Sequence, residues 1–265
     1  MNKSRKITLV FASILGSLFI ALFFLISCRV DHTPYFNSTY YQNTSSRLDS
    51  LKKKRILIND FVEAGFSKVS ITPSVGNVKD SIEVGQFKEA PLAGFGARKG
   101  KSATGTHDSI FVKAAAIKVG TQLVVIVGAD ILIMPPNIID DVTLLLAKKG
   151  IQRSQVFYSA SHTHSSIGAW GPGFIGEQFA GPANPRINQW LVRQIAQSVT
   201  LAISDLKPAR IGNGYFNAAP YTRNRLVGEL GTKNNDFNFI SIQQNPGTPS
   251  QQIVWVEMRV EPEGK

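Results

Sequence analysis

The chain has 265 residues, of which 43% are hydrophobic and 9% aromatic, enough for one sizeable folded domain. This composition excludes a wholly disordered chain, and a single cysteine, Cys28, excludes an internal disulfide. The net charge is +11, but residues 1–56 hold nine basic and two acidic side chains and contribute most of it. No zinc-finger, homeodomain or RNA-recognition pattern accompanies the charge, so we expect no nucleic-acid partner.

Residues 1–28 have the pattern of an export signal. Three basic residues precede an apolar run over residues 7–26, which is long enough to cross a bilayer. The tetrapeptide Leu25-Ile26-Ser27-Cys28 resembles the lipobox of bacterial lipoproteins, which implies that Cys28 carries the lipid. We therefore expect an exported, lipid-anchored protein of the bacterial cell envelope. A retained single-pass signal anchor is the alternative.

Residues 29–64 are rich in Ser, Thr, Asn and Tyr and show no sustained apolar period, which predicts a polar stalk. The stalk includes the basic run Lys52-Lys53-Lys54-Arg55. Beside a membrane tether, such a run is suited to anionic lipid head groups. We place the folded domain over residues 65–265.

Alternating and continuous apolar runs predict the elements of this domain in chain order. We expect a first strand at 66–73, loops over 77–105, a hairpin of strands at 111–119 and 123–131, and a helix over 137–149. A strand at 155–161, a helix over 186–206, a strand at 209–216 and a closing hairpin of 237–243 with 252–260 follow. This mixture predicts an α/β fold with a mixed β-sheet flanked by helices.

Two of the four histidines, His162 and His164, stand two residues apart where the strand at 155–161 ends. In an extended strand, positions i and i+2 point to the same face, so we expect both imidazoles to project in one direction. Imidazole is a common zinc ligand, and this spacing is typical of half of a metal site. A pair of polar loop residues is the alternative that the spacing alone leaves open.

The segment Ser159–Ser165 with its H-T-H core resembles the T-H-T-H-S-G-P-G segment of the neutral (non-lysosomal) ceramidase family. Further segments agree in the same order along the chain and cover residues 65–265. They are Gly65–Thr72 for the opening strand, Gly105-Thr106-His107 for a G-I-H segment, Val127–Asp130 for an N-A-D-L strand end, and Arg223-Asn224-Arg225 for an R-N-R-S element.

The resemblance implies a partial ceramidase-like catalytic domain that hydrolyses the N-acyl amide bond of ceramide or a related lipid amide. It implies that His162 ligates a Zn²⁺ ion, that His164 acts as general base, and that Arg225 lies near the oxyanion. The family's remaining zinc ligands fall beyond Lys265, so we expect the chain to be the front portion of the domain, with its C-terminal half missing.

Three further residues are candidates for the substrate pocket: His107, Ser165 and Trp170. Asp130, at a strand end, is suited either to orienting a ligand histidine or to capping a loop. The alternative function is a non-catalytic, membrane-tethered surface lipoprotein that retains the fold.

Overall fold

In the computed structural model, the chain divides into two units, one that contains Met1–Ile56 and one that spans Leu57–Glu261. The structure describes residues 3–25, 33–53, 58–98, 100–224, 227–228, 230–231, 233–244 and 253–258.

The first unit contains two helices, α1 (Lys3–Leu25) and α2 (Thr39–Lys53). Within α1, the stretch Arg5–Phe23 is long and apolar enough to cross a membrane, and none of it is buried within the protein. An export signal has the same length and composition. Helix α2 lies inside the segment expected to be a polar stalk. It buries no residue, and a helix that is polar on all sides leaves no apolar period in the sequence.

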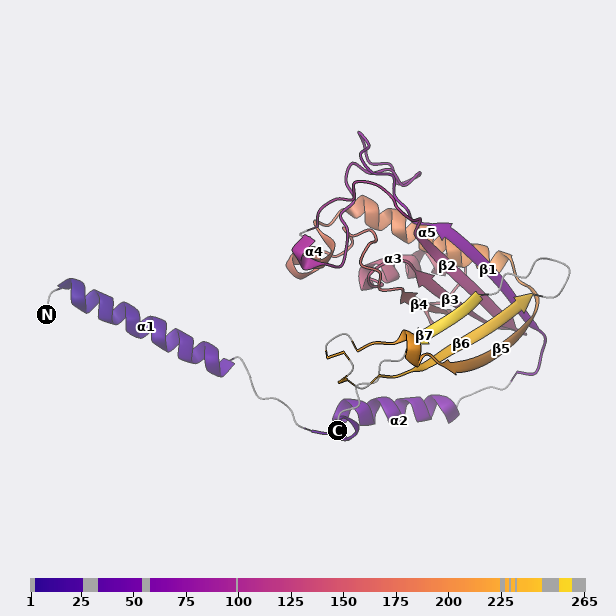
Figure 1. Ribbon diagram of the computed structural model, residues 1–265, viewed down its shortest axis with the longest axis horizontal. Helices are drawn as coiled ribbons and strands as arrows, with labels where there is room; N and C mark the ends of the chain where they lie inside the picture. Colours follow the sequence, from indigo (N-terminus) through magenta and orange to yellow (C-terminus); the bar gives the residue numbers. More distant parts are fainter. Residues whose placement is uncertain are drawn as a thin grey trace. The chain divides into compact units, whose positions relative to one another are not determined.

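A seven-stranded mixed sheet organises the second unit (Figure 1). Its strands are β1 (Val62–Ser70), β2 (Phe111–Val119), β3 (Gln122–Ala129), β4 (Val156–Ala160), β5 (Lys207–Asn217), β6 (Asp236–Gln244) and β7 (Ile253–Met258). The spatial order is β4-β3-β2-β1-β5-β6-β7. The β3–β4 pair is parallel, and the other pairs of these strands are antiparallel. The predicted α/β fold and both predicted hairpins are confirmed, although residues 245–252, between the strands of the closing hairpin, lie outside the described residues.

Three helices accompany this sheet: α3 (Pro136–Ala147), α4 (Gly173–Ala180) and α5 (Pro185–Ser204). Helix α5 packs against β1, β2 and β3, α3 packs against α5, and β5–β7 curl away from both helices (Figure 1). The larger hydrophobic core lies between α5 and the sheet and includes Leu191 and Ile195. Ile242 of β6 packs with Phe66 and Ala115 in a separate small cluster, so the sheet folds partly over itself.

The C-terminal end of α5 lies directly against β1. A Cβ atom on Gly65 would collide with the carbonyl oxygen of Ala202, so glycine permits this close approach. The carboxylate of Asp205, just after α5, accepts hydrogen bonds from the backbone N–H of Phe66 (3.0 Å) and from Nε2 of Gln244 (3.0 Å). It also pairs with Nζ of Lys207 at 2.7 Å. We call this cluster the Asp205 junction, and it joins α5, β1, β5 and β6.

Candidate functional site

The histidine pair follows β4, which runs parallel to β3 and pairs with it from Val156 to Ala160. The backbone N–H of Ser161 still bonds to the carbonyl of Ala129, and the chain then turns. His162 has a φ of 58°, in the left-handed region that non-glycine residues rarely adopt. The expectation that both histidines sit on extended strand was therefore wrong, because the strand ends before the first of them.

The turn nevertheless brings the two imidazoles together. Their ring centroids lie 5.0 Å apart with the planes at 79°. Nδ1 of His162 lies 2.7 Å from the carbonyl oxygen of Leu132, at the start of the β3–α3 connection. A carbonyl can only accept, so Nδ1 carries the proton and donates it. Nε2 of the neutral ring then keeps its lone pair. His162 is exposed, and its tautomer is the one that ligates a metal through Nε2.

His164 is held from a distant part of the chain. Its ring packs against Phe95, with centroids 4.7 Å apart, and against Gly94, whose φ of 120° and missing Cβ allow the ring to approach. The guanidinium of Arg98 donates to the backbone carbonyl of His164 at 2.9 Å. Nδ1 of His164 is buried and has no hydrogen-bond partner in the part of the chain that the structure describes. An imidazole nitrogen in this state is unusual for a purely structural residue.

The loop after the histidines is fixed by close backbone packing. A Cβ on Gly168 would collide with the carbonyl of Ala180, and the N–H of Gly168 donates to the carbonyl of Pro91. Trp170 is 3% exposed, and its indole N–H donates to the carbonyl of Ile167 at 2.9 Å. The structure therefore places Trp170 in the core as an anchor of this loop and not on the pocket wall.

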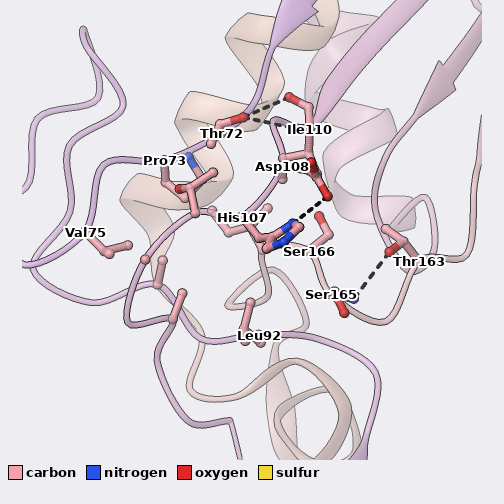
Figure 2. Close-up of a pocket in the computed structure, with 15 residues that line it drawn as sticks. Thr72, Pro73, Val75, Leu92, His107, Asp108, Ile110, Thr163, Ser165 and Ser166 are labelled. Atoms are coloured by element: carbon pink, nitrogen blue, oxygen red, sulfur yellow. Dashed lines mark hydrogen bonds and ion pairs between the residues drawn. The ribbon is translucent and has the colours of Figure 1, made fainter.

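A pocket of about 470 Å³ opens beside the histidine loop. Figure 2 shows Thr163 and Ser165 on one side of it and Pro73 on the other, with His107 between them. Nδ1 of His107 lies 2.8 Å from the carboxylate of Asp108, and both side chains are almost fully exposed. The wall combines apolar side chains with hydroxyl groups, a character that suits a ligand with both an apolar body and polar groups.

Ser166 lines the pocket but is not among the predicted site residues. Its side chain is buried, and its hydroxyl has no hydrogen-bond partner among the described residues. The backbone carbonyl of Ser166 accepts from the N–H of Ala93, which ties the histidine loop to the loop region over 77–105. The hydroxyl of Ser166 is therefore a desolvated polar group at the pocket that no group in the described part of the chain satisfies.

The structure places the predicted site residues in different surroundings. His162 and His164 are brought together, and His107 and Ser165 line the adjacent pocket. Arg225 and Cys28 lie outside the described residues. Asp130 accepts from the backbone N–H of Phe111 at 3.0 Å, which is the capping role left open by the sequence.

One nitrogen atom among the described residues has the chemistry of a metal ligand. No group of three His, Cys, Asp or Glu side chains suited to a metal ion occurs within the described ranges. The carbonyl of Leu132 holds the ring proton of His162 on Nδ1. Nε2 of the same ring therefore has the lone pair that zinc requires of a nitrogen ligand.

Comparison with known proteins gives a structural likeness without a sequence match. No family model matches the chain, and no curated protein matches it. The crystal structure of neutral ceramidase from Pseudomonas aeruginosa superposes with a TM-score of 0.58 at 17% identity, over 72% of this chain and 30% of that one. A ceramidase structure described as complexed with C2 gives a TM-score of 0.56 at 18% identity, over 71% and 30% of the two chains. The chain thus spans about a third of the length of these structures, and over that span it has the fold of a neutral ceramidase.

Proposed function

We propose that this protein is a zinc-dependent amidohydrolase that cleaves the N-acyl amide bond of ceramide or a related lipid amide. The observation that carries the proposal is the pair of imidazoles, 5.0 Å apart, at the end of β4 in a sheet with the neutral ceramidase fold. Identity of 17% with the bacterial enzyme supports the fold only, so the reaction rests on the chemistry of the site.

His162 is the proposed zinc ligand. Its hydrogen bond to the Leu132 carbonyl holds the ring in one orientation and leaves Nε2 available to the ion. The remaining ligands come from outside the described residues. A zinc ion supplies two kinds of chemistry when bound, since it lowers the pKa of a coordinated water and polarises a carbonyl group.

His164 is the proposed general base. Its Nδ1 has no hydrogen-bond partner among the described residues, so no protein group fixes a proton there. Phe95 and Gly94 pack against the ring and hold it in place, and because Nδ1 is buried, Nε2 is the nitrogen proposed to face the attacking water. The unprotonated nitrogen of a neutral imidazole carries a lone pair, and it is therefore suited to accept a proton from an attacking water molecule.

Arg225 is the proposed stabiliser of the negative charge that develops on the amide oxygen. His107 and Ser165 are the proposed polar contacts of the substrate, because both line the pocket beside the histidine loop. For Trp170 we propose a positioning role in place of contact with the substrate. Its indole N–H donates a hydrogen bond to the carbonyl of Ile167 and so fixes the loop that carries these residues.

We further propose that the protein is exported and held at the membrane by its N-terminus. Helix α1 contains one stretch that suits either a signal or a membrane span. Lipidation of Cys28 distinguishes the lipoprotein from the signal anchor. Incorporation of labelled palmitate into wild-type protein, but not into Cys28→Ser, is expected for the lipoprotein. Unchanged processing of the variant supports the single-pass anchor.

Hydrolysis of a fluorescent N-acylsphingosine tests the proposed reaction. We expect release of the labelled fatty acid by the full-length wild-type protein that supplies the remaining ligands, and loss of that release in His162→Ala. We expect retention in His32→Ala, a control that removes the histidine of the segment predicted to be a polar stalk. A wild-type protein without activity and without zinc, but correctly folded, would leave the non-catalytic surface lipoprotein as the better account.

A further inference from the structure

Helix α4 presents large apolar side chains to solvent. Phe174 is 79% exposed, Ile175 is 73% exposed and Phe179 is 52% exposed, whereas Ala180 is the only buried residue of the helix. At 100° per residue, the three large side chains fall within an arc of roughly 140°. An amphipathic helix of a water-soluble protein normally turns such a face towards the core, and α4 does the opposite.

The apolar surface continues to the histidine pair. The carbonyl of Phe179 accepts a hydrogen bond from the N–H of Gly94 at 2.8 Å, so α4 and the segment around Phe95 are neighbours. Phe95 is itself 52% exposed, and the same ring packs on His164. We call Phe95, Phe174, Ile175 and Phe179 together the α4 ridge.

Cationic side chains border the ridge. The guanidinium of Arg98 lies 5.0 Å from the centre of the Phe95 ring, and Lys101 is exposed three residues further on. Residues 91–101 contain no acidic side chain, and α4 contains one, Glu177. Aromatic and aliphatic side chains flanked by Lys and Arg are the pattern by which protein surfaces enter the head-group region of a bilayer.

We propose that the α4 ridge inserts into the surface of a lipid bilayer, with Arg98 and Lys101 against anionic head groups. A membrane is favoured over a protein partner because the chain already carries an apolar N-terminal helix suited to a membrane. A second copy of the chain is disfavoured by size, since a stable protein interface uses about 20–30 residues a side and the ridge has four. Contiguous exposed apolar groups on a soluble surface also mark an interaction site in general.

The ridge has a consequence for the proposed site. Because Phe95 belongs to the ridge and contacts His164, insertion brings the histidine pair to the membrane surface. A lipid amide then reaches the imidazoles without leaving the bilayer. This consequence rests on the proposed function, whereas membrane contact by the ridge does not.

Tryptophan quenching by brominated lipid tests the ridge directly in the full chain. Phe174→Trp places the probe on the ridge, and Tyr215→Trp places it on β5 at a matched exposure of 76%. Both variants keep the native tryptophans, so their difference reports the added indole. In vesicles of brominated phosphatidylcholine with phosphatidylglycerol, we expect the emission of the indole added on the ridge to shift to the blue and to be quenched. The emission of the indole added on β5 should stay unchanged.

Two further variants sharpen the result. Ile175→Ser with Phe179→Ser, in the Phe174→Trp background, should reduce the quenching, because one fully buried large apolar side chain is worth about a tenfold change in partition. Arg98→Gln with Lys101→Gln should remove the difference between anionic and neutral vesicles.

Equal quenching of the ridge probe and the β5 probe, or no quenching of the ridge probe, would overturn the proposal. Self-association of the chain in place of quenching would overturn it too, and would assign the ridge to a second copy. None of these readouts requires hydrolysis, so they stand even if the protein proves inactive.

Discussion

The Asp205 junction and the histidine loop (residues 161–168) differ in whether their polar groups have hydrogen-bond partners. At the junction, the carboxylate of Asp205 has three partners from three different elements. In the histidine loop, Nδ1 of His164 and the hydroxyl of Ser166 are buried without partners among the described residues, and His162 adopts a left-handed backbone. Satisfied polar clusters stabilise a fold, whereas unpaired buried groups and backbone strain gather where a protein binds or reacts. The contrast supports a stabilising role for the end of α5 and agrees with the proposed catalytic role of the loop after β4.

The largest expected effect comes from the base of the proposed reaction. His164→Ala should lower kcat by about 10²–10⁴-fold, the usual contribution of a general base, while bound zinc and the thermal midpoint change little. Steady-state kinetics with the fluorescent amide, together with zinc analysis, measures both effects. A variant that loses zinc and activity together would make His164 a ligand and would contradict the division of roles between the two rings.

The next effect is on stability and belongs to the junction. Asp205→Ala should lower the free energy of unfolding by about 2–3 kcal/mol, because charged hydrogen bonds are lost and the Phe66 N–H is left unpaired. Urea unfolding measures it. Amide hydrolysis at a temperature where the variant is folded should be unchanged, and a parallel loss of activity would show that the two regions are not separate.

The same carboxylate gives a pH dependence. Burial by itself raises the pKa of Asp205, but the hydrogen bonds from Lys207 and the Phe66 N–H outweigh it and hold the pKa below its ordinary value. A group with a depressed folded-state pKa stabilises the protein above its unfolded pKa and loses that contribution as the pH falls. The stability difference between wild type and Asp205→Asn should therefore shrink below about pH 4. A difference that stays constant to lower pH would rule out the ionised carboxylate as its source.

The smallest effect is expected at Ser166. Ser166→Ala removes a hydroxyl with no partner among the described residues, so stability should stay within about 0.5 kcal/mol of the wild type or rise. Ser198→Ala is the matched control, because that serine is equally buried but its hydroxyl lies 2.7 Å from the hydroxyl of Ser67. It should cost about 1 kcal/mol. Equal losses in thermal unfolding would mean that Ser166 is bonded after all.

Regular elements of the second unit were predictable because their apolar patterns are local. The strand at 111–119 and the helix over 186–206 agree with β2 and α5 almost to the residue, since continuous apolar runs and a 3.6-residue period need no knowledge of distant contacts. Helix α2 was not predicted, because it buries no residue and therefore has no apolar pattern that the sequence could show.

The histidine pair was predictable as a pair, but not its surroundings. The partners that hold it are the carbonyl of Leu132, the ring of Phe95 and the guanidinium of Arg98. Arg98 donates to the carbonyl of His164, which lies 66 residues further along the chain. A backbone carbonyl has no sequence signature, and a loop phenylalanine is indistinguishable from any other until the fold brings it against the imidazole. The left-handed turn at His162 is likewise a product of the tertiary structure.

The central claim is that His162 holds a zinc ion, and metal content per chain tests it most directly. After purification of the full-length protein, which supplies the remaining ligands, and equilibration with zinc, elemental analysis should find about one ion in the wild type and in His32→Ala, and none in His162→Ala. A chelator should remove the ion and the amidohydrolase activity together. Equal zinc in His162→Ala, or a folded wild-type protein that takes up none, would contradict the account.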